Sequence, residues 1–277
     1  MRLYDELKKN KPAMCGLFLL SLLIIFAFIG PSFSTHTYYE TNLANKNMPP
    51  SLINFFGTDE LGRSIFVRIW WGARISLFIG ISAALIDMIV GVFYGGIAAL
   101  MGGKTEEVMM RFSDMLHSLP HLLIVILLTV IMNQGISTII IAMTLTGWIN
   151  MARIVRAQML SLKELDFITA ARSIGASKPR ILARHLIPNC FGAIITTMTL
   201  TIPQAIFTEA FLSFLGLGVQ APIASWGTMA SDGLSALSFY PWRLFFPAAF
   251  ISVTMLAFNL LGDGLQGAFD PKQRRSQ

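Results

Sequence analysis

The stretch DFITAARSIGASKPRILARHLIPN, which runs from Asp166 to Asn189, is basic and rich in small residues, although apolar runs flank it on both sides. In its first half the apolar side chains recur at helical spacing, at Phe167, Ala170, Ala171 and Ile174. Gly175 tolerates a positive φ and therefore predicts the end of this helix, and Pro179 is typical of the first turn of a second one. The stretch predicts a helical hairpin outside the membrane.

The second half of this stretch predicts another apolar side and then a break. The side chains expected on one side of the second helix are Ile181, Leu182, His185 and Leu186. Arg180 and Arg184 are left to face water or an acidic partner, and Pro188 is expected to interrupt the helix before the next apolar run. Such a hairpin can lie on anionic lipid or dock into a protein groove. Because its apolar face is narrow and rich in alanine, it suits a protein groove better.

The composition places the whole chain in a membrane. Of its 277 residues, 54% are hydrophobic and 13% are charged, whereas soluble domains carry about 25% charged residues. A transmembrane helix needs about 20 mainly apolar residues. The candidate spans are Met14–Phe33, Ile75–Leu100, Leu119–Met132, Ile136–Ala152, Phe191–Phe214 and Phe245–Leu261. We therefore expect an all-α membrane protein with about six transmembrane helices.

The distribution of basic residues decides whether the third and fourth runs are separate spans. Only Asn133, Gln134 and Gly135 suggest a turn between them. Six spans and a cytoplasmic N-terminus place sixteen of the 21 Lys and Arg residues inside, as the positive-inside bias predicts. The five left outside are Lys46, Arg63, Arg68, Arg74 and Arg243. Merging the two runs would put the basic hairpin outside, so we expect separate spans and cytoplasmic termini.

The chain is expected to form one membrane domain. Lys8, Lys9 and Lys11 precede the first apolar run, as in a secretory signal, but no small-residue cleavage site follows, which favours an uncleaved anchor. The expected parts are a cytoplasmic N-terminus (1–13), a transmembrane domain (14–271) and a cytoplasmic tail (272–277). Within the domain, residues 34–74 are expected to form an outer loop and residues 153–190 a cytoplasmic loop that contains the hairpin (residues 163–189).

Several motifs resemble one family of membrane proteins. Ala170-Ala171, Gly175 and Leu186-Ile187-Pro188 resemble the cytoplasmic EAA loop of permease subunits in ABC importers, although Thr169 stands where that loop has its glutamate. Three further blocks support the resemblance: GTDELGRSIFVRIWWGARISL from Gly57, LSFLGLGVQAPIASWGTMASDG from Leu212, and LAFNLLGDGL from Leu256. Together they are similar to peptide and nickel importer permeases, in particular the second permease subunit of dipeptide and oligopeptide systems.

This resemblance implies the type I permease fold of ABC importers, in the bacterial cytoplasmic (inner) membrane. It implies partners as well: membrane lipid, a homologous second permease subunit, two P-loop ATPase subunits that use ATP and Mg²⁺, and an extracytoplasmic peptide-binding protein. The loop would seat in a cleft on the ATPase. The residues that it would use are Phe167, Ala170, Ala171, Ile174, Gly175, Ile181, Leu182, His185, Leu186 and Pro188.

The chain itself is expected to be neither an ATPase nor a nucleic-acid binder. Gly103-Lys104-Thr105 suggests a P-loop, but that motif requires glycine where this chain has Ala98. Lys and Arg lie in short blocks between apolar runs rather than on one face, so nucleic acid is not an expected partner. Cys15 and Cys190 stand outside any Cys/His cluster, and we expect neither a metal site nor a bound cofactor.

Three acids lie in or beside the apolar runs: Asp87, Glu209 and Asp263. A carboxylate within a membrane must face protein or water, because it is costly in lipid. For Glu209 and Asp263, which adjoin glycine-rich blocks, a packing role is favoured over a place in the translocation path. Asp87 lies nearer the middle of its span and fits a packing role and a place in the path equally well.

The imported solute is expected to be a small peptide, because the chain lacks the His and Cys clusters of a metal site. A nickel or nickel-chelate importer of the same family is the alternative. A different class, an ion-coupled secondary transporter, would carry its own ion site and work without nucleotide. The cytoplasmic hairpin favours the importer.

Overall fold

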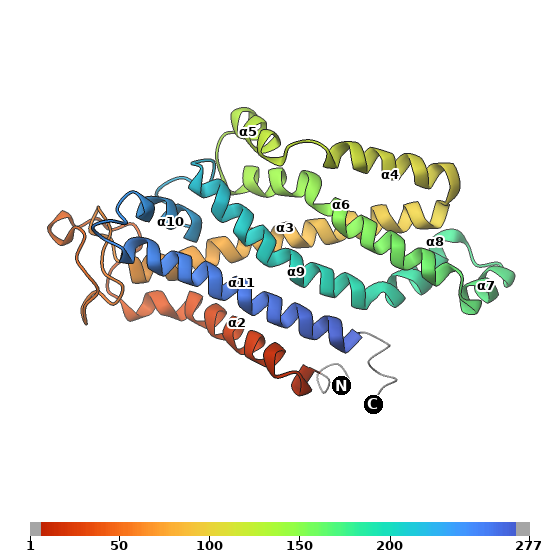
Figure 1. Ribbon diagram of the computed structural model, residues 1–277, viewed down its shortest axis with the longest axis horizontal. Coiled ribbons are helices and arrows are strands. Elements are labelled where there is room, and N and C mark those ends of the chain that lie inside the picture. Colours follow the sequence, from red (N-terminus) through yellow and green to blue (C-terminus); the bar gives the residue numbers. More distant parts are fainter. Residues whose placement is uncertain (1–6, 270–277) are drawn as a thin grey trace.

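The computed structural model describes residues 7–269, and within that range the chain is an elongated bundle of helices without a β-strand (Figure 1). Five helices are long and apolar enough to cross a membrane. They are α2 (Lys11–Ile29), α3 (Ile65–Met101), α6 (Ile136–Lys163), α9 (Ile187–Phe214) and α11 (Trp242–Phe269). The predicted all-α membrane architecture is confirmed.

A sixth crossing requires two helices together. α4 (Gly103–His117) and α5 (His121–Met132) meet at a bend of 77°. The break occurs because Pro120, the N-cap of α5, has an extended backbone (ψ 115) that a continuous helix cannot contain. The predicted span Leu119–Met132 corresponds to α5, which at about 18 Å is shorter than the roughly 30 Å hydrocarbon core. It can cross only in combination with α4.

Glycines bring the backbones of α3 and α6 into contact. Gly91 and Gly95 lie one turn apart on α3, facing Met151 and Ala152 of α6. A Cβ on Gly95 would lie 2.2 Å from the Ala152 carbonyl oxygen, and one on Gly91 would lie 2.6 Å from the Met151 Cβ. Helices in membranes associate through such close van der Waals contact between small residues. The pair α3–α6 is therefore the tightly packed centre of the bundle.

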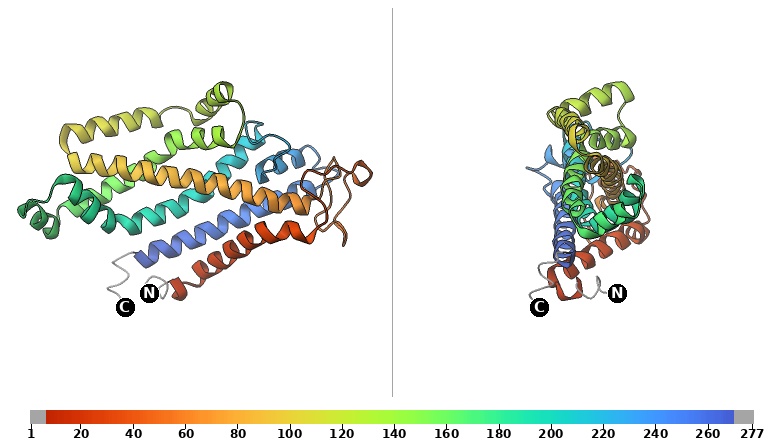
Figure 2. Two further views of the ribbon diagram at one scale, coloured as in Figure 1. Left: turned by 180° about the vertical axis from the view of Figure 1, so that it is seen from behind. Right: turned by 90° about the vertical axis from the view of Figure 1, so that its right-hand side faces the viewer.

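A second close pair forms the edge of the bundle. Gly16 of α2 packs against α11, where a Cβ on Gly16 would lie 2.6 Å from the Ala257 carbonyl oxygen. Gly264 of α11 contacts Ala13 of α2 in the same manner. The two helices lie side by side in both views of Figure 2. The first and last spans of the chain are thus joined to each other.

The bundle has two distinct ends (Figures 1 and 2). The loop end carries residues 34–64 and α10 (Trp226–Leu234). The hairpin end carries α7 (Asp166–Ser173), α8 (Lys178–Ile181) and the turn between α3 and α4. The outer loop expected at 34–74 is shorter in the structure, because α3 already begins at Ile65.

Buried apolar side chains follow the long axis of the bundle in clusters. One cluster near the loop end surrounds Trp226, with Trp70 and Ile206 among its members. Another near the hairpin end includes Met159 and Leu186. The core thus reaches from one end of the molecule to the other, and it joins the hairpin to the spans.

Candidate functional site

The hairpin has the local structure that its sequence predicts. α7 ends at Ser173, and Gly175 follows with φ +81. The backbone N–H of Gly175 donates to the Arg172 carbonyl (2.9 Å), and that of Ala176 donates to the Ala171 carbonyl (3.0 Å). Pro179 lies in the first turn of α8. These bonds satisfy carbonyls that the end of α7 would otherwise leave unpaired.

The expected interruption at Pro188 is wrong. α8 continues through the π-helical turn η3 (Leu182–Leu186) into α9, so that one helical rod runs from Lys178 to Phe214. The wide turn lies directly before the proline, whose missing N–H leaves a carbonyl of the preceding turn free. The Asn189 side chain donates to the His185 carbonyl at 2.6 Å and satisfies one acceptor in this turn. The hairpin is thus an extension of α9.

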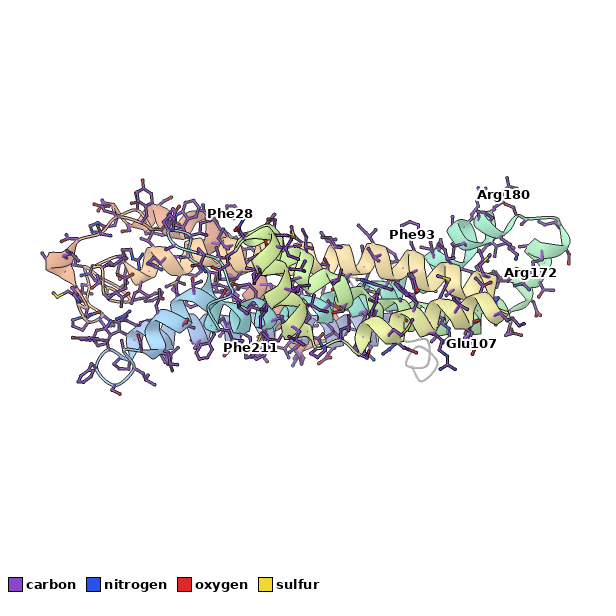
Figure 3. The ribbon with its side chains drawn as sticks, turned by 90° about the horizontal axis from the view of Figure 1, so that it is seen from above. Phe28, Phe93, Glu107, Arg172, Arg180 and Phe211 are labelled. Atoms are coloured by element: carbon purple, nitrogen blue, oxygen red, sulfur yellow. The ribbon has the colours of Figure 1, made fainter. Side chains whose placement is uncertain are left out.

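Some of the hairpin residues that are predicted to contact the ATPase form an exposed apolar tip. Ile174 is 85% exposed and Phe167 is 40% exposed. The other exposed members are Ala170, Gly175 and Pro188. Arg172 and Arg180 lie beside this tip at the far end of the molecule (Figure 3). An isoleucine exposed to this extent at the end of a hairpin has no partner within the described chain.

The other predicted contact residues lie inside the protein. Ala171, Ile181, Leu182 and Leu186 are buried, and His185 is half-buried. The buried leucines and isoleucine pack in one cluster with Met159 of α6 and Ile168 of α7. They therefore position the hairpin on the bundle and do not form its outer surface. Ile168 is fully buried and was not singled out from the sequence, although its i, i+3 spacing to Ala171 was a usable signal.

Glu209 has the surroundings of a packing residue, whereas Asp263 has those of a surface residue. Glu209 on α9 is fully buried, and it accepts hydrogen bonds from the hydroxyls of Ser76 (3.1 Å) and Ser213 (2.8 Å). Ser76 in turn accepts from the backbone N–H of Trp226, so the network joins α3, α9 and α10. Asp263 is exposed near the end of α11. Neither residue lines a cavity with Asp87.

Asp87 has different surroundings. It lies on α3, is only 6% exposed, and its Oδ1 has no hydrogen-bond partner. Its carboxylate rests against Gly147 of α6, where a Cβ would lie 2.3 Å from Oδ2. The side chain lines a cavity of about 190 Å³ between α3, α5, α6 and α9. The helices thus hold an unpaired carboxylate at a place with room for a ligand.

Most of the residues that line this cavity have polar side chains. Its other members include His121 from α5, Thr146 and Asn150 from α6, and Thr201, Gln204 and Thr208 from α9. Asn150 and Gln204 are also exposed on the bundle surface. An amide group in lipid would lose its hydrogen bonds at a cost of several kcal/mol. This face therefore meets water or protein rather than hydrocarbon.

Comparison with known proteins identifies the family. Residues 88–275 match the model of the family described as the binding-protein-dependent transport system inner membrane component. The chain belongs to this family of ABC importer permeases. Residues 3–50 of the permease also match the N-terminal transmembrane domain of oligopeptide transport permease C. Its expected family and fold class are confirmed.

Curated relatives of the permease span almost its whole length. It is 58% identical over 268 residues to the oligopeptide transport system permease protein OppC of Bacillus subtilis, covering 97% of this chain and 88% of that protein. It is also 58% identical over 273 residues to the dipeptide transport system permease protein DppC of the same organism, covering 98% and 85%. With OppC of Escherichia coli it shares 43% identity over 267 residues, covering 96% and 88%.

A solved structure shares the fold of the permease. The inward-facing MetNI methionine ABC transporter contains a chain that superimposes with a TM-score of 0.59 at 16% identity. The match covers 72% of the permease and 94% of that chain. At this identity the likeness concerns the fold alone, and it agrees with the multi-pass helical architecture.

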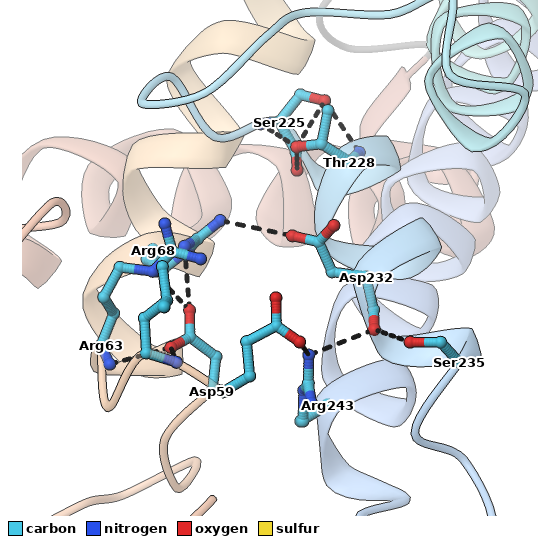
Figure 4. Close-up of polar contacts among 10 residues, drawn as sticks. Asp59, Arg63, Arg68, Ser225, Thr228, Asp232, Ser235 and Arg243 are labelled. Atoms are coloured by element: carbon cyan, nitrogen blue, oxygen red, sulfur yellow. Dashed lines mark hydrogen bonds and ion pairs between the residues drawn. The ribbon is translucent and has the colours of Figure 1, made fainter. Parts of the chain in front are cut away.

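A charged network joins the elements at the loop end of the permease (Figure 4). Asp59 accepts from Arg63 (2.6 Å) and from Arg68 (2.9 Å), and all three side chains are at least nine-tenths buried. Arg68 also lies 3.9 Å from Asp232 of α10. Burial raises the pKa of the Asp232 carboxyl, and attraction to Arg68 opposes that rise. The sequence did not reveal this network, because Asp232 lies more than 160 positions along the chain from Asp59, Arg63 and Arg68.

Arg243 extends the network to α11. Its guanidinium donates to Glu60 (3.0 Å) and to the backbone carbonyl of Asp232 (3.2 Å). All five basic residues expected outside thus lie at or near the loop end, and three of them, Arg63, Arg68 and Arg243, belong to the network. The network fixes residues 34–64 of the permease to α3, α10 and α11.

Proposed function

We propose that this permease is one of two membrane subunits of an importer that carries short peptides across the bacterial cytoplasmic membrane at the expense of ATP. The observation that carries the proposal is the hairpin, whose apolar tip at Phe167 and Ile174 is exposed while its root is buried in the bundle. Such a tip suits a groove on an ATPase subunit. The chain binds no nucleotide in this proposal, and ATP and Mg²⁺ belong to the partner subunits.

The hairpin is built to pass motion into the membrane. It continues directly into α9 and packs on α6, so a displacement of its tip shifts two spans together. Closure of two ATPase subunits around ATP would bring the two permease subunits from an inward-open to an outward-open arrangement. Moving such an equilibrium from 1:99 to 99:1 requires about 5.5 kcal/mol of differential binding, which nucleotide binding between the ATPases would supply.

The loop end is the proposed surface for an extracytoplasmic peptide-binding protein. Residues 34–64 and 220–241 lie there, held together by the Asp59–Arg68–Asp232 network. The hairpin end then faces the cytoplasm, with the first residue of α2 and the last residue of α11 on that side. Lipid surrounds the outward faces of α2 and α5, which carry exposed apolar side chains such as Phe28 and Leu127.

A docking experiment tests the ATPase contact. We expect that Ile174→Asp abolishes copurification of the P-loop ATPase subunits with the permease from solubilised native membranes, because a carboxylate cannot enter an apolar groove without cost. Phe239→Asp is the matched control, since Phe239 is 80% exposed at the opposite end. Recovery of the ATPases with both variants would refute the hairpin as their contact.

An uptake experiment tests the solute and the energy source. The names of the relatives OppC and DppC support peptides, and a nickel complex is the alternative within the same family. Proteoliposomes with the whole importer and its binding protein are supplied with labelled tripeptide or with labelled nickel chelate. Tripeptide uptake only in the presence of ATP supports the proposal. Uptake without nucleotide would instead show a secondary transporter, and uptake of nickel alone would replace the peptide as substrate.

A further inference from the structure

The Asp87 cavity has the composition of a binding site for a cation. Asp87 supplies a negative charge that is 94% removed from solvent, with an Oδ1 that nothing in the described chain satisfies. Among the described residues that line the cavity there is no lysine or arginine, and His121 is the other titratable group. A buried carboxylate without a partner is costly, and a bound cation would remove that cost.

The remaining lining supplies neutral acceptors in suitable positions. The hydroxyls of Thr201 and Thr208 donate to the carbonyls of Thr197 and Gln204 on their own helix, at 2.9 and 2.8 Å. Each hydroxyl oxygen therefore keeps lone pairs that can accept from a ligand. The side-chain carbonyls of Asn150 and Gln204 are further acceptors at the rim. A primary ammonium has three N–H donors, and one carboxylate with several hydroxyl and amide oxygens satisfies all three.

The size of the cavity distinguishes an ammonium from a metal ion. A divalent cation such as Ca²⁺ binds about six to eight oxygen ligands at about 2.3–2.6 Å, and its affinity depends on how many of them are charged. This cavity offers one carboxylate among neutral oxygens, and its space of about 190 Å³ is larger than a single ion needs. The space suits an amino group with the residue that bears it. The cavity also opens toward the exposed amides of Asn150 and Gln204, along which the rest of a chain can lie.

From this arrangement we infer that the Asp87 cavity binds the α-ammonium group of a peptide in transit and so orients its amino terminus toward α3. The inference rests on the proposed peptide import. It assigns Asp87 as the charged partner and Thr201, Thr208 and Gln204 as neutral acceptors. Gly147 is required because any side chain there would displace the carboxylate.

The first test compares uptake of a labelled neutral tripeptide by the whole importer in proteoliposomes. Asp87→Asn keeps the shape of the side chain and removes its charge, and we expect it to lower uptake about tenfold or more, as the loss of a charged hydrogen bond implies. Asp263→Asn is the matched control, because it makes the same change at an exposed acid, and uptake should stay near the wild-type rate. Asp87→Glu, which keeps the charge, should retain more uptake than Asp87→Asn.

A second test locates the amino terminus without relying on transport. Gln204→Cys is introduced together with Cys15→Ser and Cys190→Ala, and the importer is incubated with tripeptides that carry a bromoacetyl group on the first or the last side chain. We expect the first-residue probe to alkylate position 204 about fivefold faster, because binding holds the reactive group close to the thiol. This preference should disappear when Asp87→Asn is added.

The outcomes separate this inference from the proposed function. If wild-type importer takes up the tripeptide while Asp87→Asn does so equally well, or if both probes react at the same rate, the ammonium site is refuted and peptide import stands. If potassium chloride in place of sucrose removes the probe preference, the cavity belongs to an inorganic cation and the inference is also overturned. If wild type takes up no peptide under any condition, the proposed function itself fails.

Discussion

At the scale of single residues, the absence of side chains at a few glycines decides how closely the spans pack. Gly91 and Gly95 let α3 touch the backbone of α6, and Gly147 makes room for the Asp87 carboxylate. Within a membrane the hydrophobic effect does not drive helices together, so this contact contributes a large part of their association. Each of these glycines is therefore needed for close packing and not for backbone flexibility.

Gly95→Ala is expected to destabilise the permease by about 1–3 kcal/mol, which is typical of overpacking. The added Cβ would lie 2.2 Å from the Ala152 carbonyl oxygen, and a backbone atom cannot move aside as a side chain can. Thermal unfolding of the detergent-solubilised protein measures the effect. Gly135→Ala is the control, because Gly135 has an extended backbone and no atom within 4 Å of its Cβ position. Equal stability of the two variants would contradict this role of Gly95.

At the scale of elements, the hairpin depends on its turn. Gly175 has φ +81 and no neighbour within 4 Å of its Cβ position, so any effect of a substitution there arises from the backbone alone. The turn sets the angle between α7 and the rod that contains α8 and α9. The orientation of the exposed Ile174 relative to the membrane spans follows from this one residue.

Gly175→Val should therefore weaken the coupling between transport and ATP hydrolysis. A valine in the left-handed region costs about 1–2 kcal/mol or more, and relaxing that strain would turn α7 away from its native direction. Peptide-stimulated ATP turnover of the reconstituted importer reports the effect. Gly175→Asn should retain most of the stimulation, because asparagine tolerates this conformation. Similar losses in both variants would show that the turn geometry is not what matters.

The elements that local patterns encode were predictable, and those formed by distant residues were not. Apolar run length predicted the helices, and Gly175 with Pro179 predicted the hairpin turn. The Asp87 cavity could not be predicted in full, because its polar members lie on spans separated by dozens of residues and a lone threonine in a helix carries no signal. The bend between α4 and α5 could not be predicted. The apolar run after Pro120 indicates a helix, but it does not indicate the angle between that helix and α4.

At the scale of the whole molecule, buried ion pairs hold the loop end together, and close contacts at glycines hold the helices together at the centre of the bundle. Asp59, Arg68 and Asp232 join the outer segment to α3 and α10, while Glu209 joins α3, α9 and α10 from within. The hairpin end has no comparable buried ion pair among the residues that the structure describes. Buried ion pairs thus hold the segments together at the loop end, whereas apolar packing does so at the hairpin end.

Asp59→Asn should destabilise the permease strongly, by about 3–5 kcal/mol, because it leaves two buried guanidinium groups without their counter-charge. Chemical denaturation in detergent measures the loss, and limited proteolysis should show earlier cleavage within residues 34–64. Glu60→Gln serves for comparison, because the Glu60 side chain is 48% exposed and its pair with Arg243 should contribute no more than about 1 kcal/mol. An Asp59→Asn protein as stable as Glu60→Gln would argue against the network as the clamp of the loop end.

The unbroken rod from Lys178 to Phe214 has a mechanical consequence. Its 37 residues span roughly 55 Å, so a tilt of about 5° about one end would carry the other end through about 5 Å. Pro203 has no backbone N–H to donate to the preceding turn, so the rod resists bending least at this position. Thr201 and Gln204 of the Asp87 cavity lie on either side of Pro203. Bending at Pro203 would therefore link a displacement of the hairpin to the shape of the cavity.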